Sequence, residues 1–166
     1  MSTTTIENLL AAFAGESQAN RKYTVFARKA EEEGYRQAAK LFRAAAHAEA
    51  IHAANHLKAA AKVLSTKENL ATAMAGENYE VDTMYPPMLA EAEQAAEKKA
   101  ATSFRWALEV EKVHARLYHM ALELLGKEEE GDDYYVCPFC GYTHKGRLEG
   151  KCPVCNAPAE KFEQVR

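Results

Sequence analysis

Two pairs of glutamate and histidine stand out in this 166-residue chain, because the partners of each pair lie three positions apart. Glu111 and His114 interrupt an apolar stripe of helical spacing, and Glu49 and His52 do the same 62 positions earlier. Residues three apart lie on one face of a helix, one turn from each other. A carboxylate that faces a core is costly unless it is paired or binds a metal. The pattern therefore predicts inward-facing metal ligands.

The surroundings of these motifs repeat as well, so that the first 126 residues read as two related helix pairs. Phe42-Arg43 recurs as Phe104-Arg105, and Ala14-Gly15-Glu16 recurs as Ala75-Gly76-Glu77. Each half thus supplies one glutamate and one Glu-x-x-His motif. That set, aimed into a bundle of four helices, is typical of ferritin-like dinuclear carboxylate proteins. The ligands expected on this basis are Glu16, Glu49, His52, Glu77, Glu111 and His114.

The repeat is broken at one position in the second half. Glu80 lies on the inward stripe one turn after Glu77, whereas the equivalent position of the first half is Ala19. We interpret Glu80 as a fifth inward carboxylate, with an ordinary helix-face glutamate as the alternative. Pro86 and Pro87 lack the N–H group that a helix interior uses, so we expect the helix to kink or loosen close to this level.

Two other polar side chains lie on the inward stripes. Tyr23 follows Glu16 by two turns; it is either a core residue or a hydroxyl partner for a ligand carboxylate. His56 follows His52 by one turn, and a hydrogen-bonded core or interface histidine is the preferred interpretation.

All four cysteines lie near the end of the chain, as two Cys-x-x-Cys pairs separated by eleven residues. This arrangement indicates a metal site rather than a disulfide framework. Four thiolates at this spacing form a tetrahedral site that suits iron or zinc. The expected ligands are Cys137, Cys140, Cys152 and Cys155.

Four helices are expected to position the carboxylates, and a charged run links them to the cysteines. The first helix is predicted to start near Thr3–Thr5 and to end at Gly34, and the second to run from Tyr35 to Leu64. A capping box at Ser65–Glu68 begins the third helix, and the fourth runs from Glu97 to Gly126. Lys127–Asp133 is expected to be a solvated linker. We therefore predict two domains, residues 1–130 and residues 131–166.

Composition narrows the class of protein. The net charge of −3 and the absence of a basic cluster argue against nucleic acid as a partner. No apolar run reaches membrane length, and Met1–Ile6 does not begin a signal-peptide pattern. The expectation is a cytoplasmic protein without a membrane partner.

Together these motifs make the whole chain resemble the rubrerythrins. The matching residues are Ala14-Gly15-Glu16-Ser17, Glu49-x-x-His52, Glu77-x-x-Glu80 with Met84-Tyr85-Pro86, Glu111-x-x-His114 and the two cysteine pairs. The resemblance implies a mainly α fold, in which a ferritin-like four-helix bundle precedes a small rubredoxin-like domain. Asn156 stands where glycine usually follows the last cysteine. Because Asn tolerates a left-handed conformation, we expect the second cysteine turn to keep its shape.

The resemblance implies a non-haem diiron peroxidase that reduces hydrogen peroxide to water in oxidative-stress protection. Electrons would come from a rubredoxin or an NAD(P)H-linked reductase through one iron, with zinc as the alternative metal, in the four-cysteine site. By analogy, one iron exchanges Glu80 for His52 as the centre is reduced, and Tyr23 and Tyr85 orient ligand carboxylates. The implied ligands of the two non-haem irons are Glu16, Glu49, His52, Glu77, Glu80, Glu111 and His114.

Other functions and two assemblies remain open from the sequence. The chain could be a ferroxidase or iron-storage protein, or a non-catalytic metal-binding protein with zinc in the four-cysteine site. Rubrerythrin-like bundles place the second and third helices parallel, but Ser65–Lys67 reach only about 11 Å and cannot return along a helix of about 45 Å. The helices therefore either run up and down within one chain or are exchanged between two chains. The resemblance favours a domain-swapped homodimer.

Overall fold

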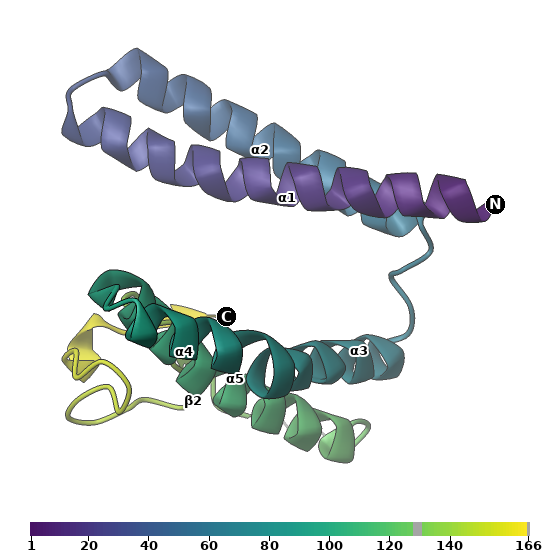
Figure 1. The fold of residues 1–166 in the computed structure, drawn as a ribbon. Coiled ribbons are helices and arrows are strands. Elements are labelled where there is room, and N and C mark those ends of the chain that lie inside the picture. Colours follow the sequence, from purple (N-terminus) through teal and green to yellow (C-terminus); the bar gives the residue numbers. More distant parts are fainter. Residues whose placement is uncertain (128–130, 166) are drawn as a thin grey trace. The chain divides into compact units, whose positions relative to one another are not determined.

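The computed structural model describes residues 1–127 and 131–165, and it is mainly α-helical, as predicted. Its contacts divide the chain into two compact units, Met1–Leu64 (unit 1) and Ser65–Arg166 (unit 2). Unit 1 is a hairpin of two helices that lie side by side, α1 (Thr3–Glu32) and α2 (Arg36–Ala59) (Figure 1). The domain boundary predicted between residues 130 and 131 adjoins residues 128–130, which lie outside the described residues, and it stays a prediction.

Unit 2 contains a second helical hairpin followed by a small sheet. Its helices are α3 (Thr66–Tyr79), the π-helix η1 (Glu80–Met84), α4 (Tyr85–Gln94) and α5 (Lys98–Leu124). The C-terminal module contains β1 (Tyr134–Val136), β2 (Thr143–Lys145), the 3-10 helix η2 (Ala159–Lys161) and β3 (Glu163–Val165). The strands form an antiparallel sheet in the order β2-β1-β3. None of the described helices is long and apolar enough to cross a membrane.

Most helix ends follow their predicted signals. Gly34 adopts a left-handed conformation (φ 83°) just after α1, and Ser65 and Glu68 form the predicted capping box at the start of α3. The predicted end of the second helix at Leu64 is wrong, because α2 ends at Ala59. Ala61 is left-handed (φ 53°), and this conformation closes the helix although the apolar periodicity continues through Val63.

The internal repeat is visible as repeated contacts. Each hairpin carries an aromatic pair and an Arg–Glu ion pair between its helices, and the residues of these pairs are 62 positions apart in the two hairpins. The equivalent pairs are Tyr23–Phe42 (ring centroids 6.2 Å apart) and Tyr85–Phe104 (6.4 Å), then Arg43–Glu31 (2.8 Å) and Arg105–Glu93 (2.5 Å). The two hairpins are therefore copies of one helix pair.

The second copy contains one more residue than the first, and η1 accommodates this extra residue. The offset is 61 between Glu16 and Glu77 but 62 between Tyr23 and Tyr85, so the second copy holds one extra residue between these points. The Tyr85 N–H bonds to the Glu80 carbonyl, five residues back, and such a wide turn absorbs an inserted residue. The predicted loosening is confirmed, but it begins at Glu80. The two prolines then occupy the first turn of α4, where their missing N–H groups cost little.

Deletion of Asp82 is expected to convert η1 into a regular α-helical turn without unfolding unit 2. The reason is that α1 joins the equivalents of Glu77 and Tyr85 by a continuous α-helix. The free energy of unfolding should change by no more than about 1 kcal/mol, an ordinary value for a single change. Circular dichroism measures whether the helix content is retained, and thermal unfolding measures the change in the free energy of unfolding.

A matched deletion in the first copy provides the control. Removing Lys22 from the uninterrupted α1 would rotate Glu16 by about 100° relative to Tyr23, so it should destabilise unit 1 much more than deletion of Asp82 destabilises unit 2. Equal loss of stability in the two variants would contradict the interpretation of η1 as an inserted residue.

Candidate metal centres

Unit 1 brings together three of the predicted ligands. Glu16 comes from α1, and Glu49 and His52 come from successive turns of α2; one ligand atom of each lies within 4.8 Å of the others. The His52 Nδ1 atom lies 2.8 Å from a Glu49 carboxylate oxygen. This hydrogen bond, with a second one from Glu16, lowers the pKa of Glu49. The group offers two carboxylates and one imidazole, as the repeat predicted.

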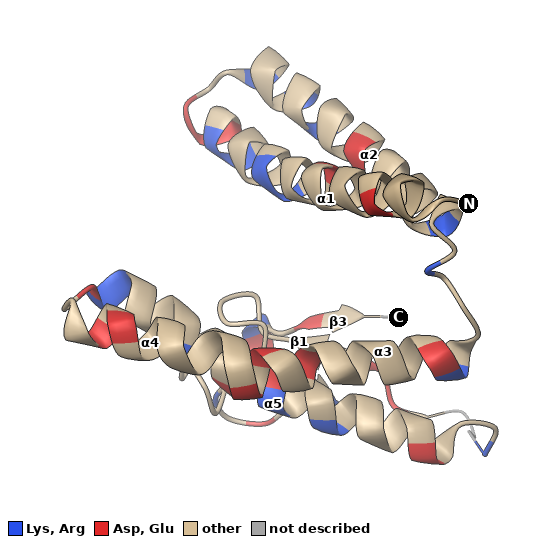
Figure 2. Ribbon diagram, turned by 45° about the vertical axis from the view of Figure 1, so that its right-hand side comes forward, with Lys and Arg blue, Asp and Glu red and all other residues tan. Residues whose placement is uncertain are grey.

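Unit 2 holds the equivalent group. Glu77 comes from α3, Glu111 and His114 come from α5, and their ligand atoms also lie within 4.8 Å of one another. The His114 Nδ1 atom lies 2.6 Å from Glu111 Oε2 and 3.8 Å from Glu77 Oε1. Acidic residues gather midway along the helices of unit 2 (Figure 2). Each unit by itself thus presents one group of two carboxylates and one imidazole.

The carboxylates of unit 2 are crowded enough to share protons. Burial and the neighbouring Glu111 raise the pKa of Glu77 to about 7. Burial also acts on Glu111, but hydrogen bonds with His114 and Glu77 outweigh it and lower the pKa of Glu111. The hydrogen bond with Glu111 raises the pKa of His114. A bound cation would replace these protons, because metal ligands must be deprotonated.

Glu80 and Tyr85 lie at the two ends of η1, next to this group. Glu80 is not among the three residues whose ligand atoms cluster within 4.8 Å. Burial and the Glu111 charge nevertheless raise the pKa of Glu80. Burial, followed by the charges of Glu80, Glu111 and Glu77, raises the pKa of Tyr85. Both side chains are therefore close enough to respond to the charge of the site.

Tyr23 belongs to an aromatic cluster in unit 1. Its ring centroid lies 6.4 Å from that of Phe26 and 6.2 Å from that of Phe42. Within the described part of unit 1, its hydroxyl makes no hydrogen bond to Glu16 or Glu49, so its predicted orienting role stays a prediction. His56 is half-buried and belongs to none of the metal-binding groups found among the described residues.

The four cysteines meet in the C-terminal module of unit 2. All four are free thiols, and their sulfur atoms lie within 4.8 Å of one another. The Sγ–Sγ distances are 3.6 Å for Cys137–Cys155 and 3.5 Å for Cys140–Cys152. A disulfide requires about 2.05 Å, whereas a tetrahedron with metal–sulfur bonds of about 2.3 Å has edges of about 3.8 Å. The sulfur atoms are therefore spaced for a metal.

The two cysteine turns share one backbone design. The Gly141 N–H donates to the Cys137 carbonyl and the Asn156 N–H donates to the Cys152 carbonyl, both at 3.0 Å. Gly141 (φ 83°) and Asn156 (φ 62°) are both left-handed, which confirms the expectation for Asn156. Burial raises the pKa of Cys137, but backbone N–H groups of Cys140 and Phe139 outweigh it, so that the pKa of Cys137 is lowered. Such N–H groups stabilise thiolates, the form that binds a metal.

Sequence reasoning missed one residue at the site. Thr143, on β2, places its hydroxyl 2.9 Å from the Nε2 atom of His114. Its position three residues after Cys140 carries no signal that would connect it to a helix 29 residues earlier. Only the packing of the C-terminal module on α5 brings the two side chains together.

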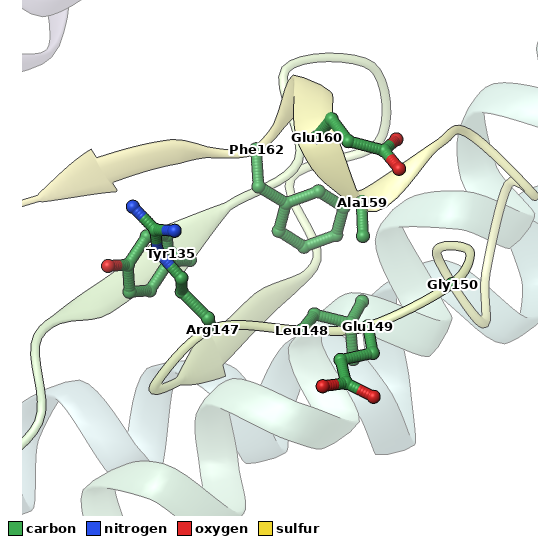
Figure 3. Close-up of a pocket in the computed structure, with 8 residues that line it drawn as sticks. All are labelled: Tyr135, Arg147, Leu148, Glu149, Gly150, Ala159, Glu160 and Phe162. Carbon is green, nitrogen blue, oxygen red and sulfur yellow. The ribbon is translucent and has the colours of Figure 1, made fainter.

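A hollow of about 570 Å³ lies elsewhere in the C-terminal module (Figure 3). Tyr135, Arg147, Glu160 and Phe162 are among its lining residues, and none of the predicted metal ligands is. Among the described residues, the groups that could hold a metal are the two carboxylate–histidine groups and the four thiolates. Carboxylate and imidazole donors suit iron, as do four thiolates.

Comparisons with known proteins agree with these donor sets. The family model of rubrerythrin matches residues 7–122, and that of the rubrerythrin rubredoxin-like domain matches residues 135–163. The chain is 39% identical to nigerythrin of Nitratidesulfovibrio vulgaris, over 95% of this chain and 85% of that protein. It is 37% identical to rubrerythrin of Porphyromonas gingivalis, over 98% of this chain and 90% of that protein.

Solved structures give the same result. A mixed-valence and a partially reduced nigerythrin match with TM-scores of 0.59 and 0.60 at 38% and 37% identity, covering 99% of this chain and 88% of each matched chain. The predicted fold class, a ferritin-like helical part followed by a rubredoxin-like module, is confirmed. The carboxylate–histidine groups and the four-cysteine group fit the dinuclear iron centre and the thiolate-bound iron of these relatives.

Proposed function

We propose that this chain, because it belongs to the rubrerythrin family, reduces hydrogen peroxide to water at a dinuclear iron centre in oxidative-stress protection. The observation that carries the proposal is the pair of matching groups, each with two carboxylates and one histidine, together with Glu80 beside one of them. Family membership and the two kinds of donor set support an iron-dependent oxidoreductase. Peroxide as the substrate is the further step that needs a test.

The proposed ligands carry a charge that suits two irons. Five glutamates supply five negative charges, against four to six positive charges on the two ions. When bound, such a centre supplies the two electrons that cleave the O–O bond; with two protons, one peroxide becomes two waters. Without a metal, the His52 and His114 Nδ1 atoms hydrogen-bond to Glu49 and Glu111, and a bound iron would take the place of the shared hydrogen. The complete proposed set is Glu16, Glu49, His52, Glu77, Glu80, Glu111 and His114.

Residues around the ligands complete the proposed site. Glu80 and His52 are proposed to exchange as ligands of one iron, with Tyr85 and Tyr23 orienting the carboxylates. A tyrosine hydroxyl is protonated at neutral pH and can donate a hydrogen bond, and burial and the site's negative charges raise the pKa of Tyr85 further. Electrons are proposed to enter through iron at the four cysteines, from a rubredoxin or an NAD(P)H-linked reductase. On this proposal residues 1–130 carry the peroxide chemistry and residues 131–166 carry electrons.

A domain-swapped homodimer is the assembly that we propose. Only six residues, 60–65, join α2 to α3, and they reach about 20 Å when extended. They cannot return along the 24 residues of α2, about 36 Å of helix. The fully buried side chains of the helices are alanines and Val110, so the larger apolar side chains of each hairpin need a further layer. A hairpin exchanged between two chains would supply that layer.

The test compares two oxidants on the iron-loaded, chemically reduced chain. We expect stopped-flow absorption to show faster reoxidation by hydrogen peroxide than by air-saturated buffer, with three irons per chain by metal analysis. Faster reoxidation by oxygen, accompanied by uptake of further iron, would instead indicate a ferroxidase. Absence of the visible thiolate-to-iron absorption band would indicate zinc at the cysteines and would contradict the proposed electron route.

Replacing Glu80 with alanine is expected to weaken the preference for peroxide over oxygen. Ala19 holds the equivalent place in the first copy, so the variant makes the two halves alike. We expect retention of the dinuclear iron and a fall in the ratio of the two reoxidation rates by about tenfold or more, or about 1.4 kcal/mol.

Glu109→Ala is the matched control, because Glu109 is an exposed glutamate of α5 that pairs with Lys112 at 2.6 Å. It should leave the rate ratio unchanged. A Glu80→Ala variant with the same rate ratio as Glu109→Ala would show that Glu80 does not determine the choice of oxidant.

A further inference from the structure

We propose that Thr143 is a positioning residue whose hydroxyl holds the His114 ring with its Nε2 protonated and its Nδ1 turned toward the metal. The inference rests on the proposed metal-binding function and adds to it a residue from outside the helices. The Thr143 Oγ1 atom, on β2, lies 2.9 Å from His114 Nε2, on α5. Both side chains are partly buried, which protects the contact from water.

The direction of this hydrogen bond follows from the single proton of a hydroxyl group. Thr143 donates that proton to the Gly141 carbonyl at 3.1 Å. Toward His114 the hydroxyl must therefore accept, and the His114 Nε2 atom must carry the hydrogen. Nδ1 is then the nitrogen that faces the carboxylates: without a metal it shares a hydrogen with Glu111 Oε2 at 2.6 Å, and a bound metal would take the place of that hydrogen. An acceptor on the outer nitrogen is the usual device that fixes the tautomer of a metal-binding histidine.

A second contact fixes the position of Thr143 itself. Gly141 packs over Val110, since a Cβ atom added at Gly141 would lie 3.9 Å from a Val110 methyl carbon. Val110 is only 2% exposed and precedes His114 by four residues, on the same face of α5. The loop after the first cysteine turn therefore rests on α5 at two successive turns. This packing fixes the position of the Thr143 backbone relative to α5, so the contact with His114 does not depend on the Thr143 rotamer alone.

The contact makes the two histidines of the repeat unequal. The chain has two Glu-x-x-His motifs but one C-terminal module, so only one histidine can meet Thr143 in each copy of the site. His52 has its Nδ1 atom 2.8 Å from Glu49, and the described residues of unit 1 offer its ring no second hydrogen bond. Its side chain is 54% exposed, against 28% for His114. His52 in unit 1 thus lacks the second hydrogen bond that His114 has, which agrees with its proposed role as the ligand that exchanges.

The test uses the full-length, zinc-loaded chain labelled with nitrogen-15 at histidine, studied by NMR at one fixed pH. We expect the His114 Nδ1 shift of a zinc-bound nitrogen and a slowly exchanging Nε2–H. In Thr143→Val the exchange of that hydrogen should accelerate about tenfold, the ratio expected for one lost hydrogen bond. Thr143→Ser keeps the hydroxyl and should restore slow exchange. Thr102→Val is the control, because Thr102 lies on α5 and its hydroxyl donates to the Lys98 carbonyl of its own helix.

Each outcome decides the inference. Slow Nε2–H exchange in Thr143→Val would show that Thr143 does not hold the ring. The thiolate-to-iron absorption of the iron-loaded Thr143→Val variant shows whether its four-cysteine site is intact. If that absorption is lost, Thr143→Ala, which removes the hydroxyl with less bulk, is used for the same comparison. A chain that shows the expected Thr143 dependence but does not reduce peroxide would overturn the proposed function alone. Failure of both zinc and iron to bind beside His114 would overturn both.

Discussion

Mixing a chain that carries Glu16→Ala with one that carries Glu111→Ala is expected to restore activity to two inactive variants. The two substitutions lie in different units, since Glu16 belongs to unit 1 and Glu111 to unit 2. In a swapped heterodimer each site combines unit 1 of one chain with unit 2 of the other. One site then carries both substitutions and the other carries none. After co-refolding, peroxide turnover should reach about half of the wild-type value per heterodimer, because one of two sites is intact.

A mixture with both substitutions in one unit is the control for this experiment. Chains with Glu16→Ala and Glu49→Ala both lack a unit 1 ligand, so no pairing gives an intact site. Native mass spectrometry establishes that heterodimers form in both mixtures. Heterodimers of the Glu16 and Glu111 variants that stay inactive would mean that each site takes its ligands from a single chain.

Replacing Cys152 and Cys155 with serine is expected to abolish sustained turnover but to spare a single reaction with peroxide. The two residues complete the four-thiolate group of the C-terminal module, which shares no residue with the carboxylate–histidine groups. Loss of the electron carrier should slow steady-state reduction by about 100-fold or more, equivalent to about 2.7 kcal/mol of activation free energy. Steady-state assays with a reductase are compared with one stopped-flow reoxidation of the dithionite-reduced chain.

Lys151→Ser is the matched control, because it changes an exposed neighbour of Cys152 and leaves all four thiolates in place. It should retain both reactions. If the cysteine variant also loses the single reoxidation while keeping its dinuclear iron, the thiolate-bound iron takes part in the peroxide step itself. The proposed division of labour between residues 1–130 and 131–166 would then be wrong.

The candidate ligands and the helix faces that carry them could be predicted from the sequence alone. Helical spacing is local, so Glu49 and His52, or Glu111 and His114, must share a face wherever their helix lies. The repeat then predicted that Glu16 and Glu77 would join them, and the structure places each beside its pair. The cysteine turns were equally predictable, because Gly141 and Asn156 supply the left-handed residue that each turn needs.

Two features of the helices could not be predicted from the sequence, because they depend on where the backbone departs from regular α-helical geometry. The end of α2 at Ala59 and the π-helix at Glu80–Met84 both lie inside stretches whose apolar period runs on without interruption. Side-chain period reports which face is buried, but it does not report which carbonyl each N–H group selects. The sequence shows that the spacing between the two copies changes from 61 to 62 residues. The hydrogen bond from the Tyr85 N–H to the Glu80 carbonyl shows how the helix accommodates the extra residue.

The contact between Thr143 and His114 was decided by tertiary structure alone. The two residues are 29 positions apart, on different kinds of element, and neither lies in a repeat that relates one to the other. Their meeting depends on Gly141 resting on Val110, which is a matter of shape between two surfaces. Local pattern predicts the candidate carboxylate and histidine ligands, because these follow helix periodicity. The groups that orient those ligands come from whichever surface packs against the helix, and no period in the sequence records that surface.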